Sequence, residues 1–306
     1  MALSTRACAK INLTLRVTGS RPDGYHELRT VLASLALHDT LTFRQRPGPF
    51  QIDCDDPACP TDRTNLVWRA AEHMWRAAGR RGAARDIAVR IEKRIPIEAG
   101  LGGGSSDAAA AIRVLNRIWG ADLSSERQHT VAARLGADVP FFLEGGTALG
   151  VDRGDLLFPL LEVPPTWVTL VVPPFGVSTK DAYRWWDESP ALRLRRPSPD
   201  WPGTSGERAR RFPGALAASL SKGELINELE RPVASRHPEI ARIVRALGRR
   251  GATHAAMSGS GSAVFGLFPS KADADRAAVV LATGARRTLV TCTVTREKYR
   301  RLCDPE

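Results

Sequence analysis

The sequence has few of the features that mark membrane-spanning, secreted or metal-stabilised proteins. It contains no run of about 18 apolar residues, so it predicts no membrane-spanning helix. Residues 1–10 include no apolar stretch typical of a secretory signal, and we expect a cytoplasmic protein. The five cysteines form no CxxC pair, and the closest two, Cys54 and Cys59, have no histidine near them at zinc-ligand spacing. This pattern indicates free thiols in a reducing compartment.

Aromatic residues are also scarce, at 6% of the chain, and they do not interleave with the basic residues. Lysine and arginine outnumber the acidic residues by 44 to 33, which gives a net charge of +11. Such an excess is typical of proteins that bind nucleic acid or anionic small molecules. Because no aromatic platform for base stacking accompanies it, we interpret the charge as solvated surface whose field favours anionic ligands. We expect no nucleic-acid partner, with a basic nucleic-acid-binding protein as the alternative from a different class.

The length of 306 residues suggests two domains, and the alternation of periodicities predicts an α+β fold. Strands are expected near residues 11–17, 40–43, 87–91, 167–172, 262–268 and 288–294, and helices near residues 65–78, 107–119, 123–135, 239–247 and 271–282. The later half reads strand–helix–helix–strand–helix–strand, which favours an antiparallel sheet. We divide the chain into residues 1–160 and 161–306, with an exposed insertion near 188–213 that is rich in proline, arginine and serine.

The most informative segment is a glycine-rich loop between a predicted strand and a predicted helix. Glycine permits positive φ and lacks the Cβ that would block close approach, so successive backbone N–H groups can point at phosphate oxygens. The helix N-terminus adds partial positive charge, and two serines add hydroxyl donors. The predicted ATP-binding residues are Pro96, Ile97, Glu98, Ala99, Gly100, Leu101, Gly102, Gly103, Gly104, Ser105 and Ser106.

Two better-known phosphate loops do not fit this segment. A Walker A loop requires GxxxxGK[ST], and no lysine follows these glycines. A Rossmann fingerprint requires GxGxxG after the first strand of a βαβ unit, whereas Ser105 stands here in place of the third glycine. By itself, the loop therefore predicts only that the chain binds phosphate.

Three ordered motifs together resemble those of the GHMP kinase superfamily. They are the loop itself, Ala9–Leu13 (Ala-Lys-Ile-Asn-Leu) near the N-terminus, and Ala256–Phe265, a second glycine-rich turn before a strand. The resemblance implies an ATP-dependent small-molecule kinase with Mg2+ as a second cofactor. It also implies the GHMP two-domain fold, in which a ribosomal-protein-S5-domain-2-like N-terminal domain precedes a ferredoxin-like C-terminal domain.

Two further segments narrow the resemblance within the superfamily. Arg21–Leu28 (Arg-Pro-Asp-Gly-Tyr-His-Glu-Leu) and Gly136–Phe142 (Gly-Ala-Asp-Val-Pro-Phe-Phe) resemble the branch that phosphorylates the 2-hydroxyl of 4-diphosphocytidyl-2-C-methyl-D-erythritol. That reaction belongs to the non-mevalonate route to isoprenoid precursors. The alternative within the superfamily is another small-alcohol kinase, acting for example on mevalonate or homoserine.

Phosphoryl transfer requires an in-line hydroxyl, neutralised phosphate charge and a proton acceptor. Asp138, in a turn framed by glycine and proline, is the candidate base. Lys10 is the candidate cation that orients Asp138 and offsets charge developing on the γ-phosphate. The resemblance assigns the catalytic pair to these two positions. They lie 128 positions apart (138 minus 10), so the hypothesis requires the fold to bring them together.

The resemblance also implies a pocket for a cytidine diphosphate-linked polyol. Tyr25 and His26 would line the cytidine site, with Thr179 and Tyr183 as its second wall, and Asn12 would contact the polyol or the diphosphate. Asn65 precedes a helix and fits either an adenosine contact or a helix cap. The metal ligands stay open because no carboxylate cluster marks a metal site, and we expect Mg2+ to be held by phosphates, water and a loop serine. The oligomeric state is also open.

Overall fold

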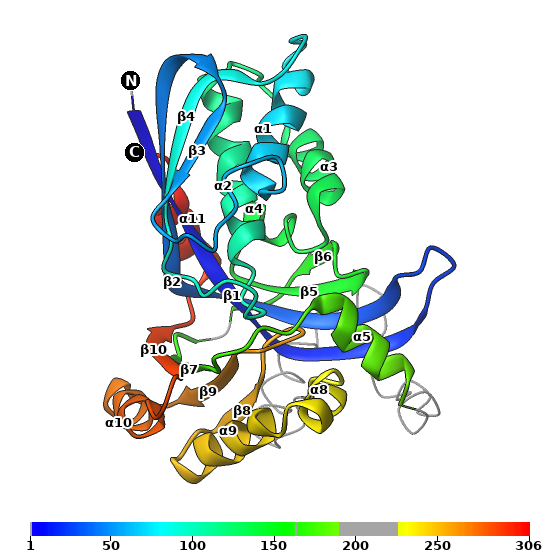
Figure 1. Cartoon of the computed structure of the whole chain (residues 1–306), viewed down its shortest axis with the longest axis vertical. Helices are drawn as coiled ribbons and strands as arrows, with labels where there is room; N and C mark the ends of the chain where they lie inside the picture. The colour runs from blue at the N-terminus through cyan, green and yellow to red at the C-terminus, as the bar shows by residue number, and fades with distance from the viewer. Residues whose placement is uncertain (1, 163, 190–225) are drawn as a thin grey trace.

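The computed structural model describes residues 2–162, 164–189 and 226–306, and its two sheets lie against each other (Figure 1). The predicted insertion near 188–213 lies outside the described residues, apart from Glu188 and Ser189. Within those ranges, no helix is both long and apolar enough to cross a bilayer. The division of the chain at residue 160 stays a prediction.

The larger sheet has the strand order β3-β4-β2-β5-β6, with β1 paired to β2. Its strands are β1 (Ala2–Ser20), β2 (His26–Pro49), β3 (Gln51–Cys54), β4 (Arg85–Glu92), β5 (Thr147–Asp152) and β6 (Leu156–Pro159). The antiparallel β1–β2 hairpin is interrupted by register shifts, one of them between Cys8 and Lys10. Such irregularities bend a strand and redirect its side chains, and this one falls at a predicted catalytic residue.

Helices gather on one face of this sheet (Figure 1). They are α1 (Leu66–Ala77), α2 (Gly103–Ile118), α3 (Ser125–Leu135) and the short α4 (Phe141–Glu144). The alanine run of α2, residues 108–111, is fully buried, because small side chains allow close contact with neighbouring elements. The side chain of Ser124 caps α3 by accepting from the Arg127 amide.

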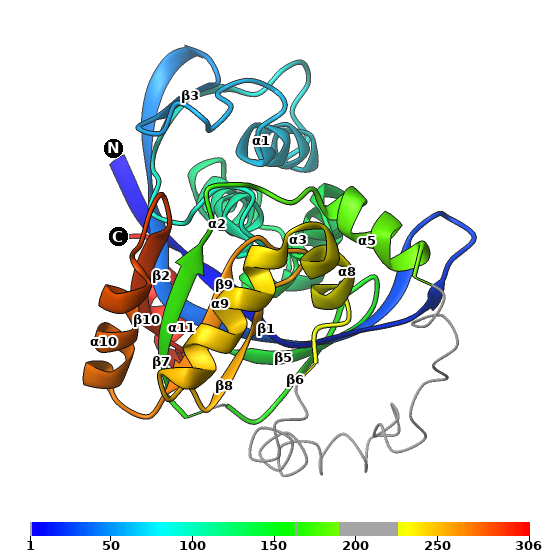
Figure 2. The ribbon, with the colours of Figure 1, turned by 60° about the horizontal axis from the view of Figure 1, so that its bottom comes forward.

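The smaller sheet has the order β10-β7-β9-β8, and every neighbouring pair in it is antiparallel. Its strands are β7 (Trp167–Val172), β8 (His254–Met257), β9 (Val264–Phe268) and β10 (Arg287–Cys292). The helices of this half of the chain are α5 (Thr179–Asp187), α8 (Glu230–Arg236), α9 (Pro238–Arg249), α10 (Lys271–Leu281) and α11 (Arg296–Cys303), of which α11 contacts β1 and β2. The strands follow the order of a ferredoxin-like unit, and Figure 2 shows α9 and α10 covering this sheet. The predicted α+β fold and antiparallel sheet are confirmed.

A shared apolar core joins the two sheets. Ile11 and Leu35 of the larger sheet are buried in the same cluster as Leu170 and Phe265 of the smaller one. The Val294 amide also donates to the Ser34 carbonyl at 2.9 Å. These contacts fix the second glycine-rich turn, which lies between β8 and β9, relative to β1.

Several elements were not expected from the sequence, each for an identifiable reason. The segment 40–43 is only part of the 24-residue β2, whose remainder mixes polar and apolar residues without clean alternation. Strand β8 has only four residues, and α11 is so rich in charge that its buried face consists of Tyr299 and Cys303. Short or strongly polar elements carry little periodic signal.

The buried imidazole of His254 on β8 predicts an acid-sensitive fold. Burial lowers the pKa of His254 to about 4, below the usual 6.5. The unfolded chain therefore binds a proton first as the pH falls, and the folded state loses stability between about pH 6.5 and pH 4, by up to about 1.4 kcal/mol per pH unit. Denaturant unfolding of His254→Gln across this range should show a shallower loss than the unsubstituted protein. Parallel curves for the two proteins would contradict the assignment.

Candidate active site

The glycine-rich loop crosses from β4 to α2 and is packed tightly against the C-terminal half. Gly100 and Gly102 both have φ of +74°, and Gly102 is the N-cap of α2. A Cβ at Gly100 would lie 2.1 Å from the Ser258 carbonyl oxygen, and one at Gly102 would lie 2.6 Å from the Phe142 ring. Ser258 Oγ in turn donates to the Gly100 carbonyl at 3.0 Å. The second glycine-rich turn thus holds the first loop in place.

Alanine substitutions should separate the strained glycines of this loop from the permissive one. We expect Gly100→Ala to destabilise the protein by more than about 1 kcal/mol, because it combines positive φ with a backbone clash. Gly104→Ala is the matched control, since its Cβ would meet only Leu66 at 3.9 Å and a helical alanine is favoured over glycine. Denaturant unfolding should therefore rank Gly104→Ala at or above the unsubstituted protein. Equal losses in both variants would contradict this geometry.

The two predicted catalytic residues lie side by side at the end of this loop. Lys10 Nζ is 3.4 Å from Asp138 Oδ2, and the lysine side chain is 4% exposed against 39% for the aspartate. The Lys10 amide donates to the Leu101 carbonyl at 3.0 Å, which ties β1 to the glycine loop. The fold therefore brings together two residues from distant parts of the chain, with the carboxylate open to solvent and the ammonium enclosed.

A polar chain fixes the Lys10 ammonium from behind. Lys10 Nζ donates to Asn12 Oδ1 at 2.7 Å, and Asn12 Nδ2 donates to Thr30 Oγ1 at 2.7 Å. Thr30 completes the chain by donating to the Thr14 carbonyl at 2.8 Å. Gly259 closes the other side, since a Cβ there would lie 3.2 Å from Lys10 Nζ. Asn12 therefore has its amide donor and acceptor engaged in orienting Lys10.

Asp138 owes its position to the turn between α3 and α4. Helix α3 ends at Leu135, and the Val139 amide donates to the Gly136 carbonyl at 3.2 Å. Val139 and Phe142, which both follow Asp138 in the chain, are fully buried. The carboxylate is thus presented from a short segment anchored by apolar side chains.

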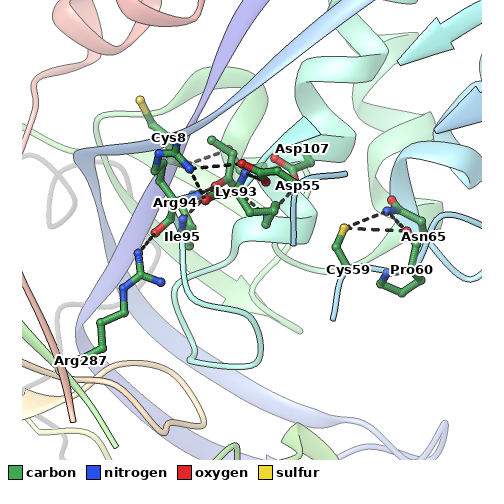
Figure 3. A network of polar contacts seen from close by, with 12 residues as sticks. Cys8, Asp55, Cys59, Pro60, Asn65, Lys93, Arg94, Ile95, Asp107 and Arg287 are labelled. Carbon is green, nitrogen blue, oxygen red and sulfur yellow. Dashed lines mark hydrogen bonds and ion pairs between the residues drawn. The ribbon is translucent and has the colours of Figure 1, made fainter. Parts of the chain in front are cut away.

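A buried ion-pair cluster, Asp39–Lys93–Asp107, joins the two ends of the glycine loop. Figure 3 shows Lys93 and Asp107 of this cluster. Lys93 Nζ lies 2.5 Å from Asp39 Oδ2 and 2.9 Å from Asp107 Oδ2. Asp39 Oδ1 also accepts from the amides of Arg94 at 2.6 Å and Ile95 at 2.8 Å, just before the loop begins. Asp107 directly follows the loop, so the cluster clamps the loop at both ends.

The protonation of this clamp follows from its burial. Burial raises the pKa of Asp107 to about 7, although the Lys93 charge opposes that shift. Burial also lowers the pKa of Lys93, but the carboxylates of Asp107 and Asp39 outweigh it and hold that pKa above its usual value. Lys93 therefore stays charged at neutral pH. Asp107 Oδ1 is buried and finds no hydrogen-bond partner among the described residues.

The predicted nucleobase residues lie where the β1–β2 hairpin meets α5 (Figure 2). The His26 ring stacks on the Tyr183 ring with 4.7 Å between centroids. Tyr25 is 54% exposed, and the Arg153 guanidinium lies 5.2 Å over its ring. Burial, and then the charge of Asp138, raise the pKa of Tyr183, so this wall lies within electrostatic reach of the predicted base. Thr179 Oγ1 lies 3.0 Å from Ser260 Oγ of the second glycine-rich turn.

Two further predicted residues have structural partners. Ser106 Oγ donates to the Cys8 carbonyl at 2.7 Å and is buried, which leaves Ser105 as the more accessible loop hydroxyl. Asn65 Oδ1 accepts from the Val67 amide at 2.8 Å, so Asn65 caps α1. Its Nδ2 donates to the Pro60 carbonyl at 2.6 Å, so both ends of the amide are occupied.

Comparison with known proteins shows the family to which this chain belongs. Residues 65–146 match the family described as GHMP kinases N terminal domain, and residues 211–285 match GHMP kinases C terminal. The 4-diphosphocytidyl-2-C-methyl-D-erythritol kinase of Pelotomaculum thermopropionicum is 41% identical over 301 residues, covering 96% of this chain and 98% of that protein. This chain belongs to the 4-diphosphocytidyl-2-C-methyl-D-erythritol kinase family. It is accordingly an ATP-dependent small-molecule kinase.

Solved structures agree with the family assignment. A crystal structure of 4-(cytidine 5'-diphospho)-2C-methyl-D-erythritol kinase is 35% identical with a TM-score of 0.75, covering 95% of this chain and 98% of that one. The Methanococcus jannaschii mevalonate kinase has a TM-score of 0.71 at 13% identity, covering 96% and 98% of the two chains, and so shares the fold alone.

Sequence reasoning missed several residues that support the site of this kinase. Asp39, Lys93 and Asp107 carried no recognisable signal, because Lys93 stands in the charged run Glu92–Arg94, which is typical of solvated surface. Thr30 and Asp187 were also missed. Asp187 follows two tryptophans near the end of α5, and that combination of aromatic and acidic residues could have drawn attention to it.

Proposed function

We propose that this kinase transfers the γ-phosphoryl group of ATP to the 2-hydroxyl of 4-diphosphocytidyl-2-C-methyl-D-erythritol, with Asp138 as the base and Lys10 as the assisting cation. The observation that carries the proposal is the 3.4 Å contact between Lys10 and Asp138, set between the glycine loop and the aromatic residues at α5. The substrates named for its relatives support the choice of acceptor.

In the proposed reaction, the acceptor hydroxyl donates its proton to Asp138 as its oxygen bonds to the γ-phosphorus. The bond from that phosphorus to the bridging oxygen breaks, and ADP leaves with the electron pair. Lys10 lies beside the developing charge, and its enclosure strengthens the electrostatic stabilisation it provides. Asn12 and Thr30 contribute by holding the ammonium in one place, so that little reorganisation is needed during transfer.

We propose Mg2+ as the second cofactor, carried on the ATP phosphates. Among the residues that the structure describes, no group of three histidine, cysteine or acidic side chains could hold a metal ion. In kinases, Mg2+ keeps several waters and binds largely through substrate phosphates. Ser105, in the first turn of α2, is the loop hydroxyl that would contact it. When bound, the ion would neutralise phosphate charge during transfer.

A substrate panel tests the proposal. The purified protein is incubated with ATP, Mg2+ and one acceptor at a time, and ADP release is measured together with the phosphorylated product. We expect turnover with 4-diphosphocytidyl-2-C-methyl-D-erythritol and little with mevalonate or homoserine. Turnover of either of those alcohols, with none of the cytidyl substrate, would overturn the proposal.

A further inference from the structure

The imidazole of His26 is held on several sides by α5. The Tyr183 ring stacks on it with an interplanar angle of 20°, and the Trp186 ring meets it nearly edge-on at 5.6 Å between centroids. Asp187 Oδ1 lies 3.0 Å from His26 Nε2, and the histidine side chain is only 11% exposed. The ring therefore has a fixed plane and a fixed direction.

The contact with Asp187 also determines which nitrogen of the ring carries hydrogen. An ionised carboxylate can only accept hydrogen bonds, so His26 Nε2 must be the protonated nitrogen. In a neutral imidazole the other nitrogen, Nδ1, then carries a lone pair and acts as an acceptor. Within residues 2–162, 164–189 and 226–306, no hydrogen-bond partner of His26 Nδ1 is seen. The ring thus offers one oriented acceptor.

We infer that Asp187 is a positioning residue that gives this kinase its preference for cytosine over uracil, by fixing the His26 tautomer. The inference rests on the proposed cytidyl substrate. The 4-amino group of cytosine is a donor and matches the Nδ1 acceptor. The 4-carbonyl oxygen of uracil is an acceptor and would oppose the Nδ1 lone pair, leaving both polar groups unpaired.

The placement of Asp187 supports a role beyond helix stability. It is the last residue of α5, where the helix dipole disfavours negative charge. Asp187 Oδ1 is nevertheless directed to His26 Nε2, while the neighbouring Glu188 pairs with Arg236 at 2.9 Å. Asp181, on the first turn of the same helix, pairs with Arg184 at 2.8 Å and provides a matched carboxylate away from His26.

Two measurements on the full chain test the inference. Calorimetric titration with CDP and with UDP gives the ratio of affinities for the unsubstituted protein, Asp187→Ala and Asp181→Ala. We expect the unsubstituted protein to prefer CDP, Asp187→Ala to reduce that preference by about tenfold or more, and Asp181→Ala to retain it. Nitrogen-15 spectra, with the His26 signal identified by its loss in His26→Gln, should show Nε2 protonated and Nδ1 unprotonated. In Asp187→Ala the two forms should mix.

The outcomes separate the two proposals. A folded Asp187→Ala variant with an undiminished preference for CDP would overturn the role of Asp187 and leave the cytidyl substrate standing. A protonated Nδ1 with an unprotonated Nε2 in the unsubstituted protein would also overturn it. Equal affinity of the unsubstituted protein for CDP and UDP would contradict the choice of a cytidyl substrate itself, and with it this inference.

Discussion

Replacing Asp138 with asparagine is expected to lower kcat by about 100- to 10,000-fold while leaving the KM values for ATP and acceptor within a few-fold. Asparagine has nearly the same shape and can still contact Lys10, but its amide cannot take the proton of the acceptor hydroxyl. Because the side chain is 39% exposed and the turn is anchored by Val139 and Phe142, the variant should fold normally. Steady-state kinetics with both substrates varied would separate the effect on kcat from the effect on KM.

Asp304→Asn serves as the control, since this exposed residue follows α11 and stands apart from the site. Its kinetics should match those of the unsubstituted protein. Lys10→Met should lower kcat as well, and the double variant should lose less than the product of the two single effects, because the residues act as a unit. A kcat near that of the unsubstituted protein in Asp138→Asn would contradict the assignment of the base.

Replacing Lys93 with methionine is expected to lower the free energy of unfolding by about 3–5 kcal/mol. The lysine side chain is 5% exposed, and its two partners are almost fully buried, so its loss leaves buried carboxylates without a cation. Asp107 can respond by taking up a proton, since burial already raises its pKa to about 7. Asp39 would keep the amide donors of Arg94 and Ile95 but lose its cation. Denaturant unfolding at neutral pH measures the loss.

Arg90→Met is the matched control for this prediction. Arg90 pairs with Asp53 at 2.9 Å, but both side chains are more than half exposed. Such surface pairs contribute about 0–1 kcal/mol, so the control should unfold close to the unsubstituted protein. Comparable losses in the two variants, or no loss in Lys93→Met, would show that the clamp does not stabilise the loop. We also expect Lys93→Met to raise the KM for ATP, because the clamp fixes both ends of the phosphate loop.

Local sequence features predicted the loop and the helices on which it depends. Glycines between a strand and the start of a helix are typical of a phosphate-binding loop, and the run of four alanines marks α2. The pairing of Lys10 with Asp138 came from motif resemblance, since no local pattern links residues so far apart. Neither a local pattern nor a motif pointed to the Asp39–Lys93–Asp107 cluster. Lys93 and Asp39 are 54 positions apart, and their contact depends on how β2 and β4 pair.

In the second wall of the nucleobase pocket, too, local spacing follows from the sequence, whereas the contact with His26 does not. Tyr183 and Asp187 are one helical turn apart, so their presence on one face of α5 follows from the helix. That this face meets His26 depends on packing between the β1–β2 hairpin and the C-terminal half. For Ser106, the local sequence suggested a hydroxyl that donates to phosphate. In the structure this hydroxyl donates to the Cys8 carbonyl instead.

The most direct test is a crystal structure with a non-hydrolysable ATP analogue and 4-diphosphocytidyl-2-C-methyl-D-erythritol bound together. We expect the triphosphate to bind the backbone N–H groups of residues 97–106, with the γ-phosphate beside Lys10 Nζ. We expect the 2-hydroxyl of the acceptor to lie within hydrogen-bond distance of Asp138, about 2.6–3.2 Å. A triphosphate bound away from this loop, or an acceptor hydroxyl directed away from Asp138, would contradict it.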